Sequence, residues 1–148
     1  INRCLRRSMS RVQLKPLDYY KFSLLITVRT TDLNYGGHLG NDKLLSLIHE
    51  ARVAYLESLG YKEREFAGVS LIMGDSAIVY QGEGFAGDKL KIEVDCSEVT
   101  RCGFRLNYRV TKSDNSPIAL VENGMICFDY ENKKVIPLPD EAKTKLGK

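Results

Sequence analysis

The 148-residue sequence contains no run of apolar residues long enough to cross a membrane as a helix, which takes roughly 18 in succession. It has no tryptophan, and its cysteines include no Cys-x-x-Cys pair. The only two histidines, His38 and His49, are not spaced as metal ligands. A Gly-x-Ser-x-Gly motif is absent as well. These absences argue against a membrane-spanning segment, a structural metal site and a serine nucleophile of the α/β-hydrolase kind.

The composition is that of one ordinary globular domain. Hydrophobic residues make up 43% and charged residues 28% of the chain, close to the average for such domains. A chain of this length buries enough surface to form a core without disulfide or metal support. We interpret the cysteines as reduced thiols, which predicts a cytoplasmic protein. They are Cys4, Cys96, Cys102 and Cys127.

Positive charge is concentrated at the N-terminus. Residues 1–17 contain five basic residues and no acidic one, whereas the rest has 17 basic and 19 acidic residues, a net charge of −2. We predict a basic extension over 1–17, a single domain over 18–139 and a C-terminal tail over 140–148. The sequence begins with Ile1, and Met9 is a candidate for the natural start of the protein. Because the body lacks a basic face, we expect no nucleic-acid partner and no membrane partner.

Strands are indicated by apolar and polar residues that alternate along five segments, because such alternation gives a sheet one buried and one wet face. Gly74 and Asp75 mark a possible bulge in the second of these segments. Short connections join the last four segments, which favours an antiparallel sheet. The five segments are residues 20–29, 69–81, 88–99, 103–112 and 118–130.

One long helix is predicted between the first and second strands. Asn41 or Asp42 caps its start, it runs to about Leu59, and Gly60 ends it. A helix of some 18 residues is about 27 Å long, and its apolar face needs a large sheet to cover it. The predicted class is therefore α+β, a curved antiparallel sheet of about five strands around one long central helix. The apolar face consists of Leu44, Leu47, Ile48, Ala51, Ala54 and Tyr55.

Three short stretches carry a resemblance to a known family. They are residues 28–32, which end at Asp32, residues 37–41, which read Gly-His-Leu-Gly-Asn, and residues 48–52, which contain Glu50-x-Arg52. In this order they resemble the hot-dog fold acyl-CoA thioesterases of the 4-hydroxybenzoyl-CoA thioesterase-like group, over roughly residues 18–138. The resemblance implies hydrolysis of an acyl thioester, carried by CoA or acyl carrier protein, to a free acid and a thiol. It implies no cofactor, and a homodimer or homotetramer with sites between subunits.

The glycine-rich loop and the helix start are the predicted substrate site. The first N–H groups of a helix lack internal partners and carry partial positive charge, which suits a developing oxyanion. We therefore expect the loop residues Gly37, His38, Leu39 and Gly40 to bind the thioester. Asn41 matches the family residue that orients water or substrate, although a helix cap is the simpler role. His38 is either an acid or base, or a structural part of the loop.

Two carboxylates compete for the catalytic role. The resemblance implies that Asp32 acts as general base or nucleophile, whereas its simplest role is to close a turn after the strand. In another branch of these thioesterases the working carboxylate lies on the central helix, which favours Glu50. The alternative for Glu50 is an ion pair with Lys43, Arg52 or a partner chain. The sequence leaves this choice open.

Two other functions fit the same sequence features. One is a hot-dog hydratase or dehydratase that acts on enoyl thioesters, although the interval from Asp32 to His38 does not match that pattern. The other is a non-catalytic module that binds acyl-CoA, with the basic extension contacting an acidic partner. Turnover of an acyl-CoA with release of the thiol separates the hydrolase from both.

Overall fold

The computed structural model describes residues 10–148. The predictions that concern residues 1–9, namely most of the charge of the basic extension, the thiol of Cys4 and the start at Met9, lie outside the described residues. No helix within the described part is long and apolar enough to cross a membrane.

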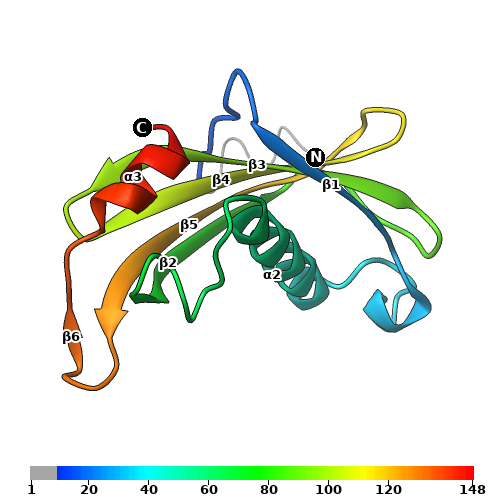
Figure 1. The fold of residues 1–148 in the computed structure, drawn as a ribbon. Helices are drawn as coiled ribbons and strands as arrows, with labels where there is room; N and C mark the ends of the chain where they lie inside the picture. Colours follow the sequence, from blue (N-terminus) through cyan, green and yellow to red (C-terminus); the bar gives the residue numbers. More distant parts are fainter. Residues whose placement is uncertain (1–9) are drawn as a thin grey trace.

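The chain forms one antiparallel sheet curved around a helix (Figure 1). The strand order is β1-β3-β4-β5-β2, and the short β6 pairs with β5. The elements are β1 (Phe22–Thr27), the 3-10 turn η1 (Thr30–Asp32), α2 (Asn41–Ser58), β2 (Ser70–Tyr80), β3 (Lys89–Thr100), β4 (Gly103–Lys112), β5 (Pro117–Asp129), β6 (Lys134–Val135) and α3 (Asp140–Leu146). The predicted α+β class is confirmed, with a short second helix that the sequence did not suggest.

The alternation read from the sequence sets the two faces of the sheet. In β3, for example, Leu90, Ile92 and Val94 are completely buried, while Lys89 and Lys91 between them are exposed. The register between β2 and β5 shifts between Met73 and Asp75, which confirms the predicted bulge. One face of the sheet is therefore available to cover α2.

The N-cap residue of helix α2 lies at least one position before the predicted one. The N-cap is Gly40, in an extended conformation, and Asn41 is the first helical residue. The prediction that Asn41 or Asp42 caps the helix was wrong, because the Asn41 side-chain oxygen accepts from the next backbone N–H (2.9 Å) and makes no cap bond. The predicted end is correct: Gly60 has a φ of +87°, a left-handed conformation that glycine adopts without strain.

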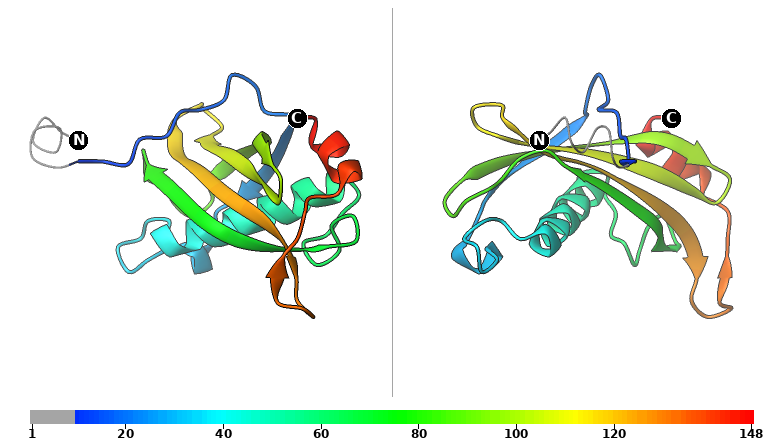
Figure 2. Two further views of the ribbon diagram at one scale, coloured as in Figure 1. Left: turned by 90° about the vertical axis from the view of Figure 1, so that its left-hand side faces the viewer. Right: turned by 180° about the vertical axis from the view of Figure 1, so that it is seen from behind.

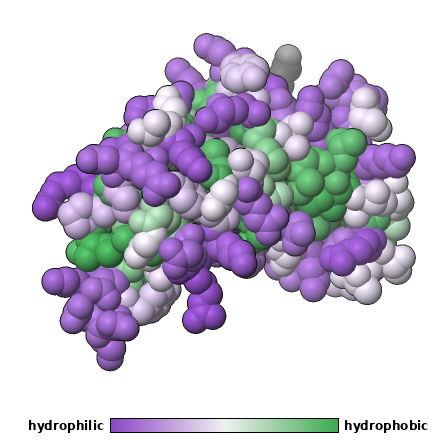
Figure 3. Space-filling view, viewed as in Figure 1, coloured by the Kyte–Doolittle hydropathy of each residue, from purple (hydrophilic) through white to green (hydrophobic). Residues whose placement is uncertain are grey.

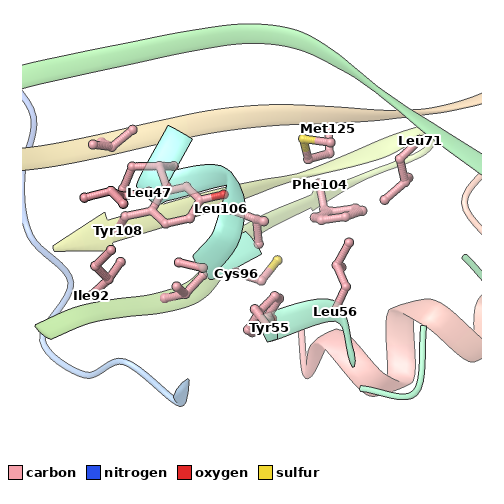
Figure 4. Close-up of a cluster of buried hydrophobic side chains, with 14 of the residues drawn as sticks. Leu47, Tyr55, Leu56, Leu71, Ile92, Cys96, Phe104, Leu106, Tyr108 and Met125 are labelled. Atoms are coloured by element: carbon pink, nitrogen blue, oxygen red, sulfur yellow. The ribbon is translucent and has the colours of Figure 1, made fainter. Parts of the chain in front are cut away.

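The core lies between α2 and the sheet. Figure 4 shows side chains of α2 meeting those of β3, β4 and β5. Five of the six residues of the predicted helix face are buried, but Ala54 is only partly so, and Arg52 and Leu56 are buried instead. Burial of each large apolar side chain stabilises the fold by about 1.5–3 kcal/mol. The core residues labelled in Figure 4 are Leu47, Tyr55, Leu56, Leu71, Ile92, Cys96, Phe104, Leu106, Tyr108 and Met125.

The two ends of the described chain pack on the sheet in different ways. The segment before β1 crosses the face away from α2 (Figure 2), where the buried ring of Tyr20 lies 4.8 Å from the Arg109 guanidinium. Residues 140–146, placed in the predicted tail, form helix α3, and its Ala142 and Leu146 are buried in the core cluster.

Both edges of the sheet carry exposed apolar side chains. Figure 3 shows a mainly hydrophilic surface with a hydrophobic area where β1 passes in the view of Figure 1, and Leu25 on β1 is 72% exposed. On the other edge, Met73 and Tyr80 of β2 are also exposed, and no strand of residues 10–148 pairs with the outer side of β2. The edge formed by β2 lies beside the start of α2, because the Tyr80 hydroxyl donates to the Asn41 carbonyl (3.2 Å).

Candidate active site

Asp32 lies in a tight turn that its own side chain holds together. One carboxylate oxygen accepts from the backbone N–H of Arg29 (2.8 Å) and from its Nε (3.2 Å), and the other accepts from its Nη2 (3.1 Å). The Asp32 side chain is only 3% exposed, whereas that of Arg29 is 69% exposed. Asp32 thus closes the turn, as its structural alternative predicted, and Arg29 is a partner that the sequence analysis missed.

The contacts of Asp32 keep it ionised. Hydrogen bonds from the Arg29 side chain, more than any other cause, lower the pKa of the Asp32 carboxyl, with the Arg29 backbone N–H and the charge of Lys43 acting in the same direction. A carboxylate with a lowered pKa is a weaker base, and one whose oxygens are already hydrogen-bonded has fewer lone pairs free for a substrate. The environment of Asp32 is therefore unfavourable for proton transfer.

The backbone of Asp32 fixes the start of α2. Its carbonyl accepts from the Gly40 N–H (2.9 Å), and the Leu39 N–H donates to the carbonyl of Gly84 (2.7 Å). Two of the backbone donors expected to hold an oxyanion are therefore already used. A Cβ on Gly40 would lie 2.7 Å from the Asp42 carboxylate, so a larger residue there would displace the exposed Asp42 side chain.

Two donors at the helix start remain free, the N–H groups of Asn41 and Lys43. The Asn41 N–H, at the first helical position, has no hydrogen-bond partner within residues 10–148, as expected for the first turn of a helix. The neighbouring Asp42 N–H is occupied by the Asn41 side chain. The candidate oxyanion site therefore lies in the first turn of α2, and the Asn41 N–H is its first donor.

The loop between η1 and α2 is a compact turn built on Asn34. The Asn34 side-chain oxygen accepts from the N–H groups of Gly36 (2.9 Å) and His38 (3.2 Å). Gly37 has a φ of +80°, which few other residues tolerate. His38 Nδ1 lies 3.3 Å from the Glu83 carboxylate, and its ring packs 5.0 Å from that of Phe85. These contacts favour a structural role for His38.

A second loop, residues 81–88, packs against the first loop beside the helix start, and the sequence analysis did not identify it. It contacts the first loop through Gly84, Glu83 and Phe85. Three glycines in this segment were the available signal. Gly84 is buried, and a Cβ there would lie 3.1 Å from the Leu39 side chain.

Glu50 lies in a different setting from Asp32. It is exposed in the middle of α2 and makes no hydrogen bond or ion pair with the described residues. It is near enough to Arg29 for its charge to raise the pKa of that guanidinium, after the larger effect of Asp32. Glu50 follows Asn41 by nine residues, which places it about 13 Å along the helix axis from the Asn41 N–H.

Arg52 shares the Glu50-x-Arg52 pattern but points into the protein. Its Nε donates to Glu63 (2.8 Å) and its Nη1 to the Asn123 side chain (2.9 Å), with Asn123 in turn donating to Ser76 on β2 (2.9 Å). Because a buried guanidinium is costly unless paired, this network fixes α2 against the sheet. It also excludes the predicted pair between Glu50 and its own Arg52 within this chain.

The histidine, cysteine and acidic side chains of the described residues were the candidates for a metal site or a thiol nucleophile. No group of three or more His, Cys, Asp or Glu side chains within residues 10–148 is arranged to hold a metal ion. Cys96 and Cys127 are buried free thiols, and burial raises the pKa of Cys127 to about 11. A thiol with so high a pKa is a poor nucleophile at neutral pH.

Comparison with known proteins gives matches over most of the chain. A family model of the thioesterase-like superfamily matches residues 28–146. The 1,4-dihydroxy-2-naphthoyl-CoA hydrolase of Synechococcus elongatus is 30% identical over 128 residues, which cover 84% of this chain and 92% of that protein. The same enzyme from another Synechococcus strain matches equally well.

Solved structures share the architecture. The 1,4-dihydroxy-2-naphthoyl-CoA thioesterase Slr0204 from Synechocystis has a TM-score of 0.78 at 19% identity, covering 84% of this chain and 94% of that one. A thioesterase from Thermus thermophilus, complexed with coenzyme A and zinc, has a TM-score of 0.77 at 19% identity and covers 88% and 100%. At these identities the likeness bears on the fold, and it confirms the expected hot-dog architecture.

Proposed function

The chain belongs to the thioesterase-like superfamily and hydrolyses acyl-CoA thioesters, and from this premise we propose a mechanism centred on the start of α2. The thioester carbonyl binds at the Asn41 N–H. Glu50 takes a proton from water as the water oxygen attacks the carbonyl carbon, and the negative charge that develops on the carbonyl oxygen is held by the helix terminus. The carbon–sulfur bond then breaks, and the CoA sulfur takes the proton back from Glu50.

The free N–H of Asn41 carries this proposal. It is a backbone donor at a helix N-terminus, next to two glycine-rich loops, and without a partner in the described chain. A preorganised donor of this kind is worth most where charge develops in the transition state. The side chain of Asn41 remains a proposed water-orienting group, and Gly37, His38, Leu39 and Gly40 shape the entrance beside it.

Glu50 is the proposed working carboxylate because it is the one whose oxygens are free. Asp32 is buried, and its oxygens accept three hydrogen bonds from Arg29. We assign Asp32 the role of a positioning residue, which sets the turn and, through its carbonyl, the N–H of Gly40 at the helix start.

The distance along α2 supports a site shared with a second subunit. Since Glu50 is about 13 Å along the axis from its own Asn41, we propose that the Glu50 of a second copy completes each site. The free edge of β2 is the proposed interface, because an unpaired edge strand readily pairs with another strand. A twofold axis there continues the sheet and makes the two α2 helices run in opposite directions on one face. This gives a homodimer, which can associate further to a tetramer.

The proposed substrate is an aromatic acyl-CoA. The hydrolases of known function that match most of the chain act, by their names, on 1,4-dihydroxy-2-naphthoyl-CoA. We therefore propose the class, a planar aromatic acyl group carried on CoA. No cofactor is part of the proposed reaction, and a cytoplasmic location remains a prediction.

A pair of variants at one position tests the carbonyl site. Asn41→Pro removes the backbone N–H, and proline is well tolerated as the first residue of a helix after an extended residue such as Gly40. Asn41→Ala keeps the N–H and removes the same side chain. We expect Asn41→Pro to lower kcat for benzoyl-CoA about 10²–10³-fold below that of Asn41→Ala, at equal melting temperature.

Equal kcat values for the two variants would exclude the proposed carbonyl site. The assay records thiol release, and crotonyl-CoA is included as a second substrate. Hydration of crotonyl-CoA without release of the thiol would show a hydratase instead.

A further inference from the structure

Tyr80 is an exposed aromatic residue beside the first residue of α2. It is the last residue of β2, on the unpaired edge of the sheet. Its hydroxyl donates to the carbonyl of Asn41 (3.2 Å), the same residue whose N–H is free. Tyr80 is nonetheless 41% exposed within the described chain, at the β2 edge where we propose that a second copy pairs.

Covalent geometry limits how far Tyr80 is from a bound substrate. The N and O atoms of one residue are roughly 3–3.6 Å apart, so the Tyr80 hydroxyl lies within about 7 Å of the Asn41 nitrogen. A carbonyl oxygen accepting from that nitrogen and the Tyr80 hydroxyl are therefore held by the two ends of one residue. This common anchor is the basis for expecting contact between the Tyr80 ring and the acyl group.

The other exposed aromatics near the site are less suited to this contact. The ring of Phe85 already packs against His38 and lies 5.1 Å from the Lys112 ammonium. Tyr35 is fully exposed at the tip of its loop. Tyr80 alone among these three is hydrogen-bonded to α2, which fixes the ring relative to the helix start.

We propose that Tyr80 is a specificity-determining residue, whose ring stacks on a planar acyl group and favours it over a saturated one. This proposal rests on the proposed carbonyl site at Asn41. Aromatic pairs in offset or edge-to-face contact gain about 0.5–1.5 kcal/mol beyond the area that they bury, which corresponds to roughly 2- to 10-fold in kcat/KM. The hydroxyl orients the ring, since its hydrogen bond to the Asn41 carbonyl fixes the ring relative to the first residue of α2.

Two substrates of equal carbon number test the ring. Benzoyl-CoA is planar next to the carbonyl, whereas cyclohexanecarbonyl-CoA is saturated. We expect Tyr80→Leu to lower the benzoyl-to-cyclohexanecarbonyl ratio of kcat/KM about 2- to 10-fold. Tyr80→Phe, which keeps the ring and loses the hydrogen bond that orients it, should give a ratio between those of the wild type and Tyr80→Leu. A ratio unchanged in Tyr80→Leu overturns the proposal, as does a ratio lost equally in Tyr80→Phe.

Tyr130 provides the matched control. It is an exposed tyrosine beyond the opposite end of the β2–β5 pair, about 36 Å away along the strands. Tyr130→Leu makes the same exchange of side chains away from the site, and we expect it to leave both substrates unaffected. A fall of the ratio in Tyr130→Leu would assign the effect to loss of a surface aromatic in general and would contradict the role of Tyr80.

A binding measurement separates this proposal from the hydrolytic one. S-phenacyl-CoA and its cyclohexyl analogue carry the ketone but no thioester, so neither is hydrolysed. We expect calorimetry to give tighter binding of the phenacyl compound to the wild type and to Tyr80→Phe, and equal binding of both to Tyr80→Leu. Selective binding without turnover of any thioester would support Tyr80 and contradict the proposed mechanism, whereas equal binding to the wild type would overturn the role of Tyr80 whatever the turnover.

Discussion

Asp32 and Glu50 carry the same functional group in two opposite environments. The Asp32 carboxylate is 3% exposed and accepts three hydrogen bonds from one arginine, while Glu50 is exposed with no hydrogen-bond partner in the described chain. Both lie in stretches that resemble known thioesterases. A carboxylate at the expected place in a motif is therefore not free to react by position alone, because its hydrogen bonds decide whether it takes a proton.

Arg29 connects the two carboxylates. It gives all its hydrogen bonds to Asp32, and the charge of Glu50 also raises the pKa of its guanidinium. The exposed arginine thus neutralises the buried acid beside the helix start and leaves the second acid without a hydrogen bond. The same acid-to-amide exchange at both positions, Asp32→Asn and Glu50→Gln, can therefore separate a structural role from a chemical one.

The largest expected effect is on turnover by Glu50→Gln. Loss of a general base lowers kcat about 10²–10⁴-fold. Because Glu50 is exposed and unpaired within the described chain, the unfolding midpoint in urea should not change. Steady-state hydrolysis of benzoyl-CoA and urea unfolding measure the two effects. Glu57→Gln, at another exposed position of α2, is the control and should keep full activity. Wild-type turnover by Glu50→Gln would end the assignment.

Mixed dimers decide which subunit supplies Glu50. One chain carries Glu50→Gln and the other Asn41→Pro, with different affinity tags so that only mixed dimers are purified. If Glu50 acts across the interface, one of the two sites is intact and about half of the wild-type activity per dimer returns. Activity no higher than that of the single variants would place both groups in the same chain and contradict the distance along α2.

Asp32→Asn should affect stability more than chemistry. The amide keeps one acceptor oxygen, but its NH₂ group faces the donors of Arg29, which leaves buried polar atoms poorly paired. We expect the free energy of unfolding to fall by about 1–3 kcal/mol, with a loss of kcat below about tenfold from a displaced helix start. Asp42→Asn, at an exposed neighbour, is the control. Unchanged stability with turnover as low as in Glu50→Gln would make Asp32 the working acid.

The sequence predicted the strands and the helix because their patterns repeat along the chain. The segment 103–112 coincides with β4, and the helix was placed within a residue at each end. The cap was missed because the Gly40 N–H is bonded to the Asp32 carbonyl and its neighbour Leu39 to Gly84, and no local pattern encodes these bonds. The role of Tyr80 depends on where β2 ends beside α2, which no pattern within β2 encodes.

The site was predicted less completely than the fold, because contacts between side chains determine it and no repeating pattern encodes them. The resemblance brought together Asp32, Asn41 and the glycine-rich loop, and the structure places these side by side. It did not reveal that Arg29, three residues before Asp32, occupies the carboxylate. The sequence alone does not select the Arg29–Asp32 ion pair, because an exposed arginine has many rotamers. Burial of Asp32 selects the rotamer that makes this pair.

The smallest expected effect is the acid dependence of the Asp32 contribution to stability. Hydrogen bonds from Arg29 lower the pKa of this carboxyl in the folded chain, whereas in the unfolded chain it is close to about 3.9. The contribution is therefore complete above the unfolded pKa and is lost as the pH falls through the folded one. Asparagine does not titrate, so the stability difference between wild type and Asp32→Asn should be constant from about pH 7 to 5 and shrink below about pH 4. Urea unfolding across this range measures it, and a difference that widens in acid would mean that folding raises the pKa of Asp32, against the hydrogen bonds seen around it.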